Sequence, residues 1–94
     1  MTDPNETIRV LKICNKRGLH ARASAKFVQL VEIFDANVLV SKDGHVVGGT
    51  SIMGLMMLAA SEGSEIHVSV SGSQAQEAMD ALKKLVEDGF GEDD

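Results

Sequence analysis

Residues 37–47 have the sequence NVLVSKDGHVV, in which two β-rich runs flank Asp43-Gly44. An Asp-Gly pair between such runs predicts a tight hairpin, because the turn requires positive φ at these positions. Asn37–Ser41 and Val46-Val47 are therefore predicted to pair as antiparallel strands. Gly48-Gly49 is expected to end the hairpin.

Two further strands are predicted on either side of this hairpin. Ile8–Cys14 contains β-branched residues and few breakers, although its apolar side chains fall on both faces. Glu65–Ser71 is the clearest strand, because Ile66, Val68 and Val70 alternate with polar residues and create one apolar face. With the hairpin, these segments predict a sheet of four strands.

Three helices are predicted between and after the strands. Polar residues recur every three or four positions in Ala21–Phe34, so this helix has a broad apolar face that suits packing on a sheet. A short helix is expected over Ile52–Leu58. The last helix is predicted to begin at Ser73, in a capping box with Gln76, and to stop at Gly89.

The order strand, helix, strand, strand, helix, strand, helix predicts an α+β fold. We expect a four-stranded, largely antiparallel sheet with the helices covering one face. A single domain is expected over residues 1–94, with its core at about residues 8–88. Residues 1–6 and 91–94 are expected to be loose ends, and the acidic tail only to be solvated.

The composition excludes several classes of protein. The chain has 94 residues, with 9 Lys+Arg and 14 Asp+Glu, and a net charge of −5 disfavours a nucleic-acid binder. The longest nearly apolar run, Ile52–Ala60, is too short to cross a bilayer. Residues 1–6 do not form a secretory signal and Cys14 is a single cysteine, so a cytoplasmic location is expected. His45 and His67 are not at metal-ligand spacing, so no metal site is expected. The sequence also has no recognisable cofactor motif, so no cofactor is expected.

The passage Gly18-Leu19-His20-Ala21-Arg22 is the candidate reactive site of the chain. A glycine-containing loop leads into the predicted helix, and His20 lies at the boundary, where unpaired N–H groups and the helix dipole form an anion site. Arg22 adds a permanent cation suited to phosphate oxygens. A neutral imidazole is a nucleophile, so the passage indicates a phosphoryl acceptor. The alternative is that His20 only precedes a helix in a surface loop.

Two stretches of the chain, GLHARASAKFV at residues 18–28 and GTSIMGLMMLAASEGSEIHVSVSG at residues 49–72, resemble the signatures of one family. It is the HPr family, the histidine-containing phosphocarriers of the bacterial phosphoenolpyruvate-dependent phosphotransferase system. The resemblance implies an open-faced β-sandwich with three helices on one face, and a monomer. It also implies a carrier and not an enzyme. His20 would accept a phosphoryl group on Nδ1 from phosphorylated enzyme I and pass it to an enzyme IIA protein, while Arg22 steadies the group.

Ser51 has two interpretations that are compatible. A serine before an apolar run is most often the N-cap of a helix. The resemblance implies that Ser51 is also the site phosphorylated by HPr kinase/phosphorylase. Phosphate at a helix N-terminus favours the helix, so phosphorylation is expected to alter docking and not to unfold the protein.

The resemblance also implies a docking surface for enzyme I beside the active site. Apolar residues at helical spacing are more commonly core, but an exposed apolar patch usually marks a partner surface. Met53 is favoured as the exposed residue, and two cations are expected at the rim. The predicted docking residues are Arg17, Lys26, Ile52, Met53 and Met56.

Ala23 departs from the family pattern, which usually has proline directly after the arginine. Alanine suits a helix, so the fold should survive, but the His20 loop would be less fixed. The departure raises a second interpretation, the nitrogen-related branch, in which phosphorylation of Ser51 or His20 switches a regulatory protein. A third interpretation is an interaction domain in which His20 and Arg22 are only surface residues.

Overall fold

The computed structural model describes residues 6–92, so most of the predicted loose ends, residues 1–5 and 93–94, lie outside the described residues. The elements follow one another in the predicted order. They are β1 (Thr7–Lys12), α1 (Ala21–Val31), β2 (Asn37–Lys42), β3 (His45–Gly48), α2 (Ile52–Met57), β4 (Glu65–Ser71), α3 (Ala75–Glu87) and a 3-10 turn η1 (Gly89–Gly91).

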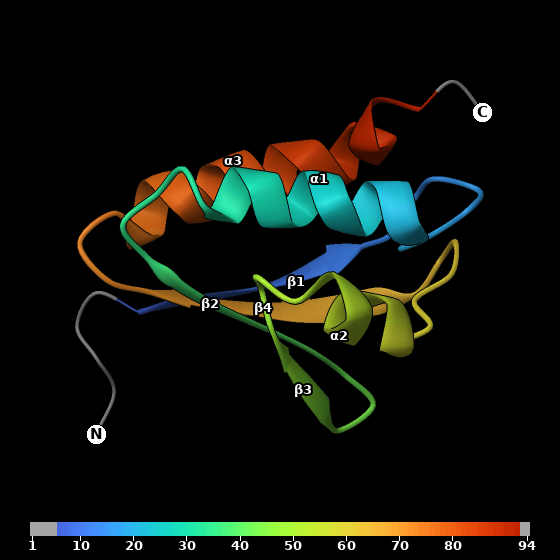
Figure 1. Cartoon of the computed structure of the whole chain (residues 1–94), viewed down its shortest axis with the longest axis horizontal. Coiled ribbons are helices and arrows are strands. Elements are labelled where there is room, and N and C mark those ends of the chain that lie inside the picture. Colours follow the sequence, from blue (N-terminus) through green and yellow to red (C-terminus); the bar gives the residue numbers. More distant parts are fainter. Residues whose placement is uncertain (1–5, 93–94) are drawn as a thin grey trace.

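The strands form one antiparallel sheet in the order β1-β4-β2-β3. The predicted hairpin is confirmed: Lys42 pairs with His45, and Asp43 and Gly44 between them both have positive φ, 51° and 83°. Figure 1 shows α1 and α3 side by side over the sheet. An open four-stranded antiparallel sheet with three helices confirms the predicted fold.

The core lies between the helices and the face of β4 that carries Ile66, Val68 and Val70, all fully buried. This burial decides the facing of β1, which the sequence left ambiguous. Leu11 pairs with Ile66 and points inward, whereas Val10 pairs with His67 on the open face and remains 51% exposed. Since neighbouring residues of a strand alternate between faces, the register with β4 determines which apolar side chains are buried.

The predicted capping box of the last helix is wrong. α3 begins at Ala75 after Gln74, and no side chain caps it. Ser73 donates its hydroxyl hydrogen to Asp35, while Gln76 donates to Asp80 at 2.8 Å. The turn after α1 therefore provides the partner of the Ser73 side chain, whereas the partner of Gln76 lies within α3 itself.

Several predicted boundaries also shift. α1 ends at Val31, short of the predicted Phe34, because the chain turns there to reach β2. Ile33, which falls within the predicted helix range, is 71% exposed in this turn. β1 ends at Lys12, so Cys14 lies beyond the strand, and its thiol donates to the Val86 carbonyl oxygen at 3.3 Å.

The helices are short. α3, the longest among the described residues, has 13 residues, and α2 has 6. Within residues 6–92, none of the helices is long and apolar enough to cross a bilayer.

Candidate functional site

His20 is placed by the loop that precedes α1. Gly18 has φ of +65°, which favours glycine, and the Leu19 N–H donates to the Ala60 carbonyl oxygen at 2.9 Å. Leu19 itself is buried and anchors the loop in the core. His20 is the N-cap of α1 with extended backbone, and its carbonyl accepts from the Ser24 N–H at 2.9 Å. The predicted position of His20 at the loop–helix boundary is therefore confirmed.

The His20 ring contacts the C-terminal turn of the chain. Its Nε2 is hydrogen-bonded to Oε2 of Glu92, and the two side chains are 16% and 13% exposed. The other oxygen of Glu92 accepts from Nδ2 of Asn15 at 2.9 Å. The acidic tail was expected only to be solvated, and Glu92 departs from that expectation. No local signal could have found this contact, because 72 residues separate His20 from Glu92.

The pKa of Glu92 is lowered below its ordinary value. The hydrogen bond from Asn15 is the largest cause, the hydrogen bond with His20 is the next, and the positive charge of Arg17 adds a smaller effect. Burial acts in the opposite direction. The carboxylate form of Glu92 is therefore the form that the folded protein stabilises.

This shift predicts that the C-terminal contact weakens in acid. A lowered pKa in the folded state contributes stability above the unfolded pKa, and the contribution is lost as pH falls through the folded pKa. Titration of the Glu92 side-chain carboxyl carbon by NMR should show a lower midpoint in the native protein than in the urea-unfolded chain. Equal midpoints would contradict the contact.

The predicted cations take different positions around His20. Arg22 lies exposed in the first turn of α1, and within residues 6–92 its side chain has no hydrogen bond or ion pair. Arg17 is exposed and lines a hollow of about 310 Å³ together with His20 and Met56. Lys26, predicted as a rim charge, instead donates to the Phe90 carbonyl oxygen at 2.6 Å and holds the C-terminal turn.

Ser51 is the N-cap of α2, as one of its interpretations predicts. Its Oγ accepts from the Gly54 N–H at 2.9 Å, and the residue is exposed. The hollow lined by His20 and Met56 places α2 beside the histidine. A charge added at Ser51 would therefore lie on an element that borders the same surface.

The cap leads to a prediction about stability. Ser51→Ala should lower the free energy of unfolding by about 1 kcal/mol, because the Gly54 N–H loses its acceptor, whereas Ser51→Asp should retain most of it. Urea unfolding of the two variants and the wild type measures both effects. Equal losses in the two variants would mean that the Ser51 oxygen does not stabilise the helix.

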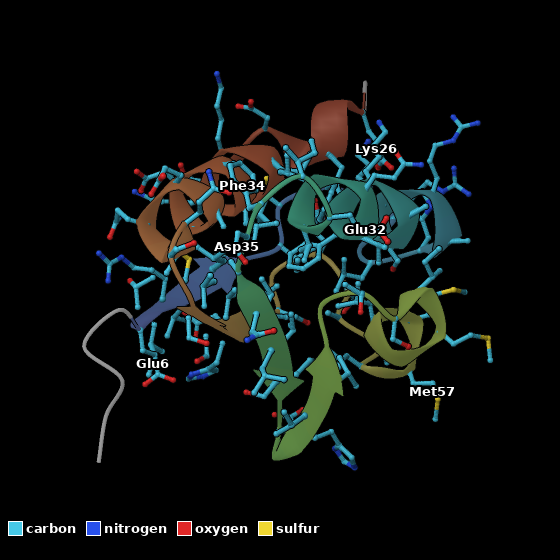
Figure 2. All side chains as sticks on the ribbon, turned by 60° about the vertical axis from the view of Figure 1, so that its left-hand side comes forward. Glu6, Lys26, Glu32, Phe34, Asp35 and Met57 are labelled. Carbon is cyan, nitrogen blue, oxygen red and sulfur yellow. The ribbon has the colours of Figure 1, made fainter. Side chains whose placement is uncertain are left out.

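The apolar side chains of α2 are exposed, so the alternative that all of them are core is wrong. Within the helix itself only Leu55 is buried. Met53 is 73% exposed, as favoured from the sequence, and Met57 reaches 80%. Met57 was not among the predicted docking residues, and Figure 2 shows it pointing outward from α2. Ile52 and Met56 are exposed to 40% and 41% and extend the same patch.

The other two histidines lie away from His20. His45 is exposed in the β2–β3 hairpin, and His67 is exposed on the open face of the sheet, opposite Val10 of β1. Among the residues described, no group of three His, Cys, Asp or Glu side chains is arranged to hold a metal ion.

Comparison with known proteins gives this arrangement a context. The family model described as the PTS HPr component phosphorylation site matches residues 8–88. Phosphocarrier protein HPr of Cupriavidus necator is 52% identical over 80 residues, which cover 85% of this chain and 90% of that protein. Fold and site thus define the class of the phosphocarrier proteins, which are carriers and not enzymes. The chain belongs to the HPr family of the phosphotransferase system, as its two signature stretches predicted.

Two further relatives show the breadth of the similarity. Phosphocarrier protein NPr of Escherichia coli is 38% identical over 86 residues, covering 90% of this chain and 96% of that protein. The crystal structure of HPr-C-His from Thermoanaerobacter tengcongensis has 41% sequence identity and a TM-score of 0.88, covering 93% of this chain and 98% of that one.

Proposed function

We propose that this protein is a cytoplasmic phosphocarrier that accepts a phosphoryl group on His20 from phosphorylated enzyme I and passes it to an enzyme IIA protein. The observation that carries the proposal is the position of His20 at the N-terminal end of α1, with Arg22 two residues further on. Family membership supports the same chemistry.

The surroundings of His20 suit a phosphoryl group. The first turn of α1 has N–H groups without partners in the helix, and its dipole favours negative charge at this end. The guanidinium of Arg22 has donors that match phosphate oxygens and carries a permanent charge. A phosphoryl group on His20 would therefore be partly neutralised where it forms.

The exposed patch on α2 is the proposed docking surface for enzyme I and the enzyme IIA protein. Four apolar side chains on one short helix are exposed beside the hollow next to His20. Exposed apolar patches rimmed by polar residues commonly mark protein interfaces. Arg17 adds a positive charge at the rim. The apolar residues proposed to dock are Ile52, Met53, Met56 and Met57.

Ser51 is the proposed site of regulation by HPr kinase/phosphorylase. A phosphate there would add a charge of about −2 at a helix N-terminus, which favours the helix while placing negative charge within the docking surface. The proposed effect is slower exchange with partners, with the fold retained.

A direct test uses phosphoenolpyruvate and a phosphotransferase enzyme I, followed by digestion with trypsin at neutral pH. Cleavage after Arg17 and after Arg22 releases the peptide of residues 18–22, whose one histidine is His20. The other histidines and Ser51 fall in the separate peptide of residues 43–83. Acid-labile phosphate is expected in peptide 18–22. Phosphate in peptide 43–83 alone, or in neither peptide, would refute the proposal.

A further inference from the structure

The C-terminal turn is held against the beginning of α1. Phe90 is 1% exposed, so its ring anchors η1 in the core, and its carbonyl oxygen accepts from Lys26 of α1. The Glu92 N–H donates to the Gly89 carbonyl oxygen at 3.1 Å. Figure 1 shows this turn beyond the end of α3, beside the N-terminal end of α1. The turn thereby places Glu92 in contact with His20.

Asn15 orients the Glu92 carboxylate. Asn15 is 1% exposed, and its Nδ2 donates to the Gly18 carbonyl oxygen and to Oε1 of Glu92, both at 2.9 Å. Its buried Oδ1 has no partner among residues 6–92. Buried polar atoms without partners are rare, so the side chain leaves its acceptor unused in order to present both donors. The Glu92 carboxylate is thus held by Asn15 on one side and contacts the His20 ring on the other.

We propose that Glu92 is a positioning residue that holds the neutral His20 ring in the tautomer with hydrogen on Nε2, leaving the lone pair of Nδ1 free as the nucleophile. A carboxylate is an acceptor only, so a hydrogen bond to it requires a hydrogen on the ring nitrogen. This inference rests on the proposed function of His20 and identifies the residue that prepares it.

The same contact serves the transfer step. The Nδ1 lone pair forms the bond to phosphorus, the bond between phosphorus and the donor's leaving group breaks, and its electron pair goes to the leaving group. His20 keeps its Nε2 hydrogen, so the ring becomes cationic and no proton has to move. The Glu92 carboxylate faces the nitrogen that carries this hydrogen. It therefore stabilises the charge that the transfer creates.

Glu92→Gln tests the role with an almost unchanged shape. Asn15 requires an oxygen at the Oε1 position, so the new amide should direct its NH₂ group toward His20 Nε2. A donor there favours hydrogen on Nδ1, which removes the nucleophilic lone pair. We expect the tautomer to change and phosphate uptake from phosphorylated enzyme I to slow by at least about tenfold. Glu87→Gln is the control, because it removes the same charge from an exposed residue at the end of α3.

The tautomer is measured by ¹H–¹⁵N correlation of the His20 ring under alkaline conditions, and the transfer by initial rates with saturating enzyme I. An unchanged tautomer in Glu92→Gln would overturn the inference, and so would a changed tautomer with an unchanged rate. An equal slowing in Glu87→Gln would also overturn it. Failure of the proposed function is recognised separately, since the wild type would then take up no phosphate on His20.

Discussion

His20→Ala is expected to abolish uptake of phosphate from phosphorylated enzyme I. The side chain supplies the only imidazole in the loop before α1, and the neighbouring Arg22 can bind a phosphoryl group but cannot accept one covalently. Radiolabelled phosphoenolpyruvate with catalytic enzyme I measures the effect, as acid-labile label retained on the protein. The wild type should reach one phosphate per chain, and the variant none.

His67→Ala is the matched control for this prediction. It also removes one imidazole, but from an exposed position on the open face of the sheet. It should therefore label as the wild type does. Circular dichroism confirms that both variants are folded. Label retained by His20→Ala would show that another group accepts the phosphate, and label lost in both variants would show that the loss is not specific to His20.

Gly18→Ala is expected to lower the free energy of unfolding by about 2–4 kcal/mol. A Cβ at this position would lie 2.3 Å from the Ala60 carbonyl oxygen and 2.9 Å from Cα of Ser61, and both are backbone atoms. The positive φ of Gly18 adds strain for any residue with a Cβ. Because Gly18 and Leu19 connect the loop to Ala60, the His20 loop should move with the clash.

Gly63→Ala separates the two causes of this destabilisation. Gly63 also has positive φ, but a Cβ there would meet no atom within 4 Å. Its expected loss is about 1 kcal/mol, from backbone strain alone. Urea unfolding of both variants gives the comparison. Equal losses would show that the close approach of Gly18 to Ala60 does not matter for stability.

Much of the fold and part of the site could be predicted because the signals are local. The Asp43-Gly44 turn depends on its own two residues and the runs beside them, and the structure has the predicted hairpin. Ser51 caps α2 through a hydrogen bond to a residue three positions away. His20 and Arg22 lie at the same helix terminus because they are only two residues apart in the sequence. Periodicity and capping chemistry act over a few residues, so they can be read without a fold.

The capping box predicted at Ser73 failed although its pattern was correct. Asp35 lies 38 residues away, and it accepts the Ser73 hydroxyl hydrogen and also hydrogen-bonds with Gln74. A partner brought close by the fold thus replaced the local one. The fold also explains the early end of α1, because the chain must turn there toward β2.

The amino-acid sequence by itself determined the order of the elements, the hairpin, the Ser51 cap of α2, and the two signature stretches that belong to the HPr family. Only the tertiary structure decided which face of β1 is buried, that Met57 of α2 is also exposed, and that Glu92 contacts His20 and Asn15. The first set depends on backbone preferences and on contacts within a few residues. The second depends on burial and hydrogen bonds between segments that become neighbours only when the chain packs.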